Sequence, residues 1–149
     1  MTIIETPIGP LHAVVNEEGR LVELGFRQSE RWTPGPLPAA VTEQLTQYFS
    51  GKRSTFDLEL APRGTAFQLA VWNALREIPY GDTISYAELA RRIGKPSAVR
   101  AVGAANGANP IPVIIPCHRV IGSNGTLTGY GGGIERKQWL LAHEGRRLF

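Results

Sequence analysis

One segment of the chain places three chemically active side chains in a row. Cys117, His118 and Arg119 directly follow the apolar run from Ile111 to Pro116. A cysteine attacks as its thiolate, and nearby cationic or proton-accepting groups lower the pKa of the thiol. An imidazole can take the proton directly or through a water. The residues predict a reactive thiol, although adjacency alone is weak evidence because neighbouring side chains on a strand point to opposite faces.

A catalytic histidine of this kind is usually oriented by a third group. Glu144 is the candidate, because the last predicted helix can fold back on the site. Glu144 is also readily explained as a structural residue near a helix C-terminus, but a carboxylate there is disfavoured by the helix dipole, which makes a functional role somewhat more plausible.

Cys117 is the only cysteine. An intramolecular disulfide and a CxxC motif are therefore excluded, and a reducing compartment is favoured. His12 and His143 have no partners at metal-ligand spacing, so we expect no metal and no cofactor. The glycine loop 129–133 lacks the Gly-Lys-Ser/Thr ending of a phosphate-binding loop.

The composition is that of a soluble globular protein. The chain has 149 residues, of which 42% are hydrophobic and 19% charged, enough for one core or two small lobes. It contains no apolar run long enough to span a membrane and no signal peptide, so we expect a cytoplasmic protein. Residues 1–60 carry five Lys/Arg and eight Asp/Glu, net −3, whereas residues 61–149 carry eleven and five, net +6. The second part is the one suited to a polyanion.

Hydrophobic patterning predicts an α/β (α+β) chain with two domains. Residues 1–61 form the first, with strands at 2–5, 11–15, 21–26 and 56–60 and a helix at 41–49 ended by Gly51. Residues 62–149 form the second, which is mainly helical. Capping boxes at Thr65 and Ser85 start two helices, a third begins at Pro96, and the last spans residues 134–143. The four-residue connection at 94–97 is typical of a helix-turn-helix.

The segment Pro116–Val120 resembles the active-site signature of the O6-alkylguanine-DNA alkyltransferases, also called methylated-DNA–protein-cysteine methyltransferases. Other motifs of that family match in order and spacing, so the resemblance covers roughly residues 64–148. They are Ile-Ser-Tyr at 84–86, Arg-Ala-Val-Gly at 100–103, Asn-Pro at 109–110, Gly-Tyr at 129–130 and Leu-Ala-His-Glu-Gly at 141–145.

The resemblance implies a role for each matching residue. Cys117 would be the acceptor nucleophile, His118 its base through a bound water, and Glu144 the group that orients the histidine. Tyr86 would help turn the nucleotide out of the helix and donate a proton toward the departing guanine. Asn109 would brace the turn between the DNA-binding helix and the active-site strand.

The resemblance also implies the DNA-binding and base-binding residues. Arg100 would fill the gap left in the base stack, while Tyr130, Gly131 and the main chain near Val120 would bind the guanine. Contacts to the DNA backbone, or close approach through small side chains, are implied for Lys95, Ser97, Ala98 and Ser123. The helix of small residues around Arg100 would dock in the minor groove with weak sequence preference.

The expected function is single-turnover repair of O6-alkylguanine in double-stranded DNA by a monomer, with cooperative binding on DNA left open. Base extrusion is needed because the O6 atom lies inside the duplex. Three alternatives remain: a lesion-sensing module that does not transfer the alkyl group, a transcriptional regulator and, more distantly, a cysteine hydrolase. Cys117 argues against the first, and the lack of base-reading side chains around Arg100 argues against the second.

Overall fold

The computed structural model describes residues 3–28, 36–125, 127, 130 and 132–145. Internal contacts divide the chain into two compact units, Met1–Arg63 and Gly64–Phe149. Antiparallel strands and helices make this an α+β fold, as the sequence predicts. No helix in the described ranges is long and apolar enough to cross a membrane.

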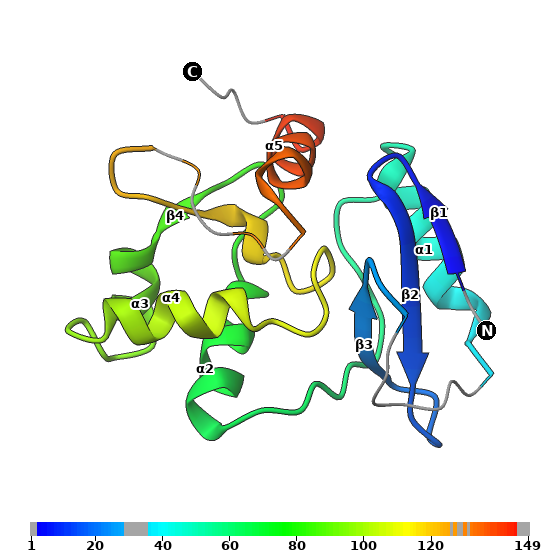
Figure 1. Cartoon of the computed structure of the whole chain (residues 1–149), viewed down its shortest axis with the longest axis horizontal. Coiled ribbons are helices and arrows are strands. Elements are labelled where there is room, and N and C mark those ends of the chain that lie inside the picture. Colours follow the sequence, from blue (N-terminus) through cyan, green and yellow to red (C-terminus); the bar gives the residue numbers. More distant parts are fainter. Residues whose placement is uncertain (1–2, 29–35, 126, 128–129, 131, 146–149) are drawn as a thin grey trace. The chain divides into compact units, whose positions relative to one another are not determined.

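In its described residues, the first unit contains an antiparallel sheet in the order β1-β2-β3 and one helix (Figure 1). The strands are β1 (Ile3–Thr6), β2 (Gly9–Val15) and β3 (Leu21–Gly25), and the helix is α1 (Ala39–Phe49). Leu11 of β2 and Leu21 and Leu24 of β3 are buried in the core, as are the α1 residues Leu45 and Tyr48. Gly51 follows the helix with a φ of 80°, as its predicted C-terminal position requires.

The strand predicted at 56–60 does not form. Only Leu60 makes an isolated parallel bridge, to Leu21. The buried side chain of Gln44 explains part of the difference, because its amide accepts from the Asp57 N–H at 2.8 Å and donates to the Asp57 carbonyl at 3.1 Å. These main-chain groups are therefore not available to a sheet partner.

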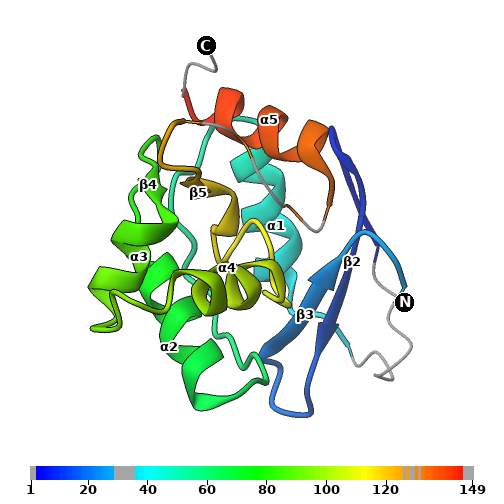
Figure 2. The same cartoon turned by 60° about the vertical axis from the view of Figure 1, so that its left-hand side comes forward.

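The second unit is mainly helical (Figure 2). Its helices are α2 (Ala66–Leu75), α3 (Tyr86–Arg92), α4 (Val99–Gly107) and α5 (Ile134–His143), with a short 3-10 helix η1 (Cys117–Arg119). Strands β4 (Ile84–Ser85) and β5 (Val120–Ile121) pair in parallel. The capping box at Thr65 and Gln68 is present. At α3, Ser85 caps the Glu88 N–H, whereas the Glu88 carboxylate binds Arg91 and Arg92.

Helices α3 and α4 pack against each other as a helix-turn-helix, but their connection is longer than predicted. It covers the six residues from Ile93 to Ala98, because Pro96 and Ser97 occupy a turn closed by a hydrogen bond from the Ala98 N–H to the Lys95 carbonyl. Helix α4 therefore begins at Val99, after Pro96 instead of with it.

Candidate active site

Cys117 lies at the start of η1, between an apolar loop and β5. Ile111, Val113, Ile114 and Ile115 of that loop are buried, and they carry the cysteine into the interior, where it is 6% exposed. The expectation of an active-site strand at this point is wrong: residues 117–119 form a 3-10 turn, and extended backbone begins at Val120. In this turn, successive side chains do not alternate between opposite faces as they would on a strand.

Asn109 braces the loop that ends at the cysteine. Its Oδ1 accepts a hydrogen bond from the Ile111 N–H at 3.0 Å, and its Nδ2 donates to the Ile115 carbonyl at 2.7 Å. The loop is strained, because the β-branched Val113 has a φ of 74°, in the left-handed region. The Asn109 side chain thus closes a turn that the backbone alone would not favour.

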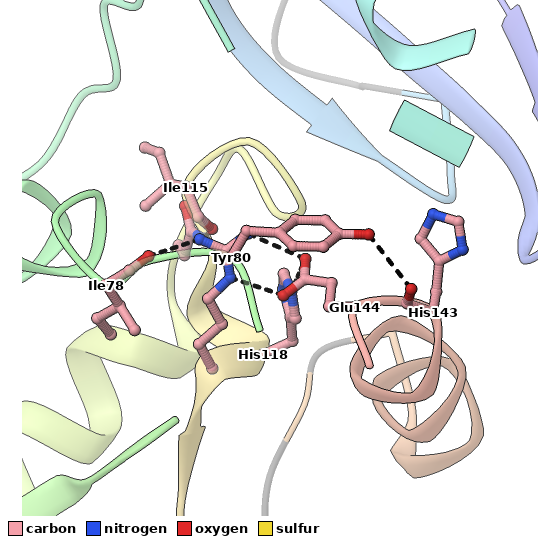
Figure 3. A network of polar contacts seen from close by, with 8 residues as sticks. Ile78, Tyr80, Ile115, His118, His143 and Glu144 are labelled. Atoms are coloured by element: carbon pink, nitrogen blue, oxygen red, sulfur yellow. Dashed lines mark hydrogen bonds and ion pairs between the residues drawn. The ribbon is translucent and has the colours of Figure 1, made fainter. Parts of the chain in front are cut away.

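Glu144 is the centre of a buried polar network (Figure 3). One carboxylate oxygen lies 2.8 Å from His118 Nε2, and the guanidinium of Arg119 binds both oxygens, at 2.8 and 3.0 Å. Arg119 also donates to the Ile78 carbonyl at 2.6 Å. The resulting pairing of Glu144 with a cation offsets its unfavourable position at the C-terminal end of α5.

The network fixes the charge state of both partners. Burial disfavours ionised Glu144, but the hydrogen bonds and charges of His118 and Arg119 outweigh this and hold the pKa of the carboxyl well below its usual range. Burial lowers the pKa of His118, against the opposing effect of Glu144, so the imidazole is neutral. Since an ionised carboxylate can only accept, His118 must donate from Nε2–H.

The other ring nitrogen of His118 therefore carries the lone pair. Nδ1 is buried and has no hydrogen-bond partner within the described residues. A neutral imidazole held from behind by a carboxylate, with its free nitrogen next in sequence to a thiol, is the arrangement of a general base. Direct contact is not required, because one water can bridge the base and the thiol.

The expectation of a lowered pKa for the thiol is wrong for the protein without substrate. Burial raises the pKa of the Cys117 thiol to about 11, although a hydrogen bond with Asn109 and the charge of Lys137 act in the opposite direction. Cys117 is thus a protonated thiol at neutral pH. A base is needed to activate it, which gives His118 a defined task.

Lys137 is completely buried, in contrast to most lysines. Its ammonium group donates to the Val120 carbonyl at 2.7 Å, directly after η1. Burial lowers the pKa of Lys137 to about 8, while Coulombic attraction to Cys117 acts to raise it. A cation is therefore present in the interior near the nucleophile.

The loop before β4 holds the end of α5 that carries Glu144. The Tyr80 hydroxyl donates to the His143 carbonyl at 3.2 Å, and the Arg119 guanidinium lies 5.8 Å from the centre of the Tyr80 ring (Figure 3). Gly81 has a φ of +87°, and a Cβ there would lie 3.2 Å from the Glu144 carbonyl oxygen. Close approach of this loop thus depends on glycine.

The other residues implied by the resemblance lie outside this network. Tyr86 is half-buried at the start of α3, Arg100 is exposed on α4, and Val120 is buried in β5. The Tyr130 hydroxyl is buried, and Gly131 lies outside the described residues. Of the candidate DNA contacts, Ala98 is half-buried, and the other three are exposed: Lys95, Ser97 and Ser123.

Three residues of the site gained no role from the sequence: Arg119 as the partner of Glu144, the buried Lys137, and Asn106, whose Nδ2 lies 3.4 Å from the Cys117 carbonyl oxygen. The signal for Lys137 was present, because positions 137, 140, 141 and 144 share one face of α5. A lysine in line with Leu140 and Leu141 is a charge on an apolar face. Asn106 is similarly a polar residue on the buried side of α4, together with Val102 and Ala105.

Comparisons with known proteins match both units of the chain to one family. The family described as "6-O-methylguanine DNA methyltransferase, DNA binding domain" matches residues 66–146, and its "ribonuclease-like domain" matches residues 1–62. A methylated-DNA–protein-cysteine methyltransferase of Mycobacterium bovis is 53% identical over 150 residues, covering 97% of this chain and 91% of the relative.

The chain is also similar to solved structures. The crystal structure of Mycobacterium tuberculosis OGT in complex with DNA has a TM-score of 0.87 and 52% identity, covering 95% of this chain and 90% of that one. S. pombe Atl1 in complex with damaged DNA containing O6-carboxymethylguanine is 37% identical, with a TM-score of 0.53, and covers 58% of this chain and 82% of its own. Together, the family match over both units and the identity over nearly the whole length show that the chain belongs to the 6-O-methylguanine DNA methyltransferase family.

Proposed function

We propose that this protein repairs DNA by transferring the alkyl group of O6-alkylguanine in a duplex to the sulfur of Cys117. One observation carries the proposal: the only cysteine is followed by a neutral, buried histidine whose Nε2 is held by Glu144 at 2.8 Å and whose Nδ1 is unpaired within the described residues. This arrangement supplies a base for a thiol that burial keeps protonated.

The reaction is an in-line displacement at the alkyl carbon. The Cys117 thiol gives its proton to His118 Nδ1 through a water, and Glu144 stabilises the imidazolium that forms. The new sulfur–carbon bond forms as the bond between the alkyl carbon and O6 breaks. Tyr86 donates a proton toward the leaving guanine, which neutralises the negative charge that develops on the base, and Tyr86 later regains a proton from solvent.

Lys137 contributes to this step electrostatically. The thiolate that develops on Cys117 is attracted by the buried ammonium group, whose opposing effect on the thiol pKa is already present before substrate binds. Buried charges interact more strongly than charges in water, because the local dielectric constant is low.

The helix-turn-helix of α3 and α4 would bind the duplex through its minor groove. Arg100 is exposed on α4 and would occupy the space of the extruded nucleotide, while the small residues of this helix allow close approach. Lys95, Ser97 and Ser123 are exposed and would contact the DNA backbone. Tyr130, Gly131 and the Val120 main chain would form the base pocket.

The product is a thioether, and the sequence holds no second cysteine that could remove the alkyl group. Each molecule would therefore act once. Residues 62–149 would perform binding and transfer, and residues 1–61 would serve as a scaffold. We further infer that the protein is cytoplasmic, because it must reach DNA in a reducing environment.

The experiment is to compare wild type with Cys117→Ser on a duplex that carries one labelled O6-methylguanine. We expect wild type to take up the label, and Cys117→Ser to retain lesion-selective binding without transfer. Label on the serine variant would refute the role of Cys117, and selective binding without transfer by wild type would indicate a lesion sensor instead.

A further inference from the structure

Asn106, in the last turn of α4, has a buried side chain that is only half satisfied. It is 2% exposed, and its Nδ2 lies 3.4 Å from the Cys117 carbonyl oxygen. Because a carbonyl oxygen can only accept, the amide must present its nitrogen to Cys117, which fixes its orientation. Its Oδ1 is then a buried acceptor without a hydrogen-bond partner in the described part of the chain.

Unpaired buried polar atoms of the second unit gather around Cys117. Besides Asn106 Oδ1, the described residues of this unit contain two others, His118 Nδ1 and the Tyr130 hydroxyl. His118 is adjacent to the cysteine, and Coulombic interaction with Cys117 contributes, after burial, to raising the pKa of Tyr130. Native proteins satisfy most buried polar groups, so such a concentration indicates a ligand that carries hydrogen-bonding groups of its own.

The chemistry of the proposed substrate identifies the group that Asn106 can bind. In O6-alkylguanine, N1 has no proton, N3 and N7 are acceptors, and N9 is bonded to the sugar. The 2-amino group is therefore the only N–H donor on the base. An amide oxygen can only accept, so the one group of the base with which Asn106 Oδ1 can form a hydrogen bond is this amino group.

We propose that Asn106 is a specificity residue of the base site, and that its Oδ1 accepts a hydrogen bond from the 2-amino group of the flipped O6-alkylguanine. The inference rests on the proposed function. Asn106 contacts the nucleophile's own carbonyl through Nδ2, so its side chain lies next to the turn that carries the cysteine. Its position is fixed by the Trp72 indole, which donates to the carbonyl of the preceding residue, Ala105, at 2.8 Å.

This arrangement also explains why a half-satisfied amide is retained. Leaving Oδ1 unpaired disfavours folding, and the group gains its partner only when substrate binds. An interaction that is absent from the free protein and present with substrate contributes to recognition. Asn106 would thus select an alkylated base that has a 2-amino group over an otherwise similar alkylated purine without one.

The test is a cycle of two proteins and two bases. Single-turnover rates of wild type and Asn106→Leu are measured at subsaturating protein on duplexes with O6-methylguanine or O6-methylhypoxanthine, which lacks only the 2-amino group. We expect wild type to prefer O6-methylguanine by roughly 10-fold and Asn106→Leu to lose most of this preference. Asn73→Leu, on the exposed face of α2, is the matched control and should keep it.

Thermal unfolding of the same proteins separates recognition from structure. Asn106→Leu removes the unpaired acceptor together with the 3.4 Å hydrogen bond of Nδ2, and the Cys117 carbonyl keeps the Val120 N–H as a partner. Its midpoint should therefore stay close to that of wild type even though its preference is lost. Asn106→Ala gives a second variant if the larger side chain prevents folding. An equal preference in wild type and a folded Asn106 variant would overturn the proposal. Equal wild-type rates on the two bases, with a slower Asn106 variant, would assign Oδ1 to water and also overturn it.

The two proposals fail differently. Absence of transfer from either base by wild type would overturn the proposed function together with this inference. Transfer from both bases without an Asn106-dependent preference would leave the proposed function intact and refute the role of Asn106 alone.

Discussion

The protonation state of Cys117 in the free protein gives the sharpest prediction about the site. An ordinary cysteine has a pKa near 8.5, whereas burial raises that of Cys117 to about 11. At pH 7.5 about one tenth of ordinary cysteine is ionised, compared with about three in ten thousand of Cys117, a difference of roughly 300-fold. Without substrate, the thiol should therefore react with iodoacetamide at least this much more slowly than the same cysteine in the unfolded protein.

The assay is the rate of carboxamidomethylation of the native protein between pH 7 and 10, followed by mass spectrometry. Because Cys117 is 6% exposed, limited access will slow the reaction at every pH, so the dependence on pH is the diagnostic quantity. We expect the rate to rise about tenfold per pH unit across the range, without a plateau. The urea-unfolded protein is the control; its rate should reach half its maximum near pH 8.5 and level off about one pH unit higher. A plateau below pH 9 in the native protein would refute the protonated resting thiol.

Three further variants test other parts of the site. Glu144→Gln should lower the free energy of unfolding by about 3–5 kcal/mol in urea denaturation, because it leaves buried Arg119 without a counter-charge; a loss below about 1 kcal/mol would contradict the network. For Lys137→Met, the free energy of unfolding should fall as pH rises from 8.5 to 10. In wild type, two effects on the free energy of unfolding oppose each other as pH rises through this window: the lowered pKa of Lys137 increases it, and the raised pKa of Cys117 decreases it. If the pH profiles of wild type and Lys137→Met are parallel, the contribution of Lys137 is excluded. Arg100→Ala should slow repair in duplex DNA but not reaction with a free O6-alkylguanine base. Equal losses of rate on the two substrates would contradict the proposal that Arg100 occupies the space of the extruded nucleotide.

Local signals in the sequence were sufficient for much of the fold. The capping box at Thr65 and the helix at 134–143 are as predicted, since each depends on contacts within a few residues. The strand at 56–60 fails because a side chain from α1, Gln44, takes the backbone groups of Asp57. The start of α4 shifts because Pro96 is equally suited to a turn and to a first helical turn.

The sequence suggested candidate residues for the site but not their energetics. Cys117, His118 and Glu144 were selected from the sequence, and the structure brings His118 and Glu144 into contact. The pKa of Cys117 was predicted in the wrong direction, because sequence neighbours suggest charge whereas burial depends on the tertiary fold. Asn106 was missed for the same reason: its contact with Cys117 joins residues that are eleven positions apart.

The most direct test of the central claim is the intact mass of the protein after incubation with a duplex that carries O6-methylguanine. We predict a single increase of one methyl group, located on the peptide with Cys117, that saturates at one group per protein however much substrate is added. An unchanged mass in the presence of lesion-selective binding, or repeated turnover without modification of Cys117, would contradict the account.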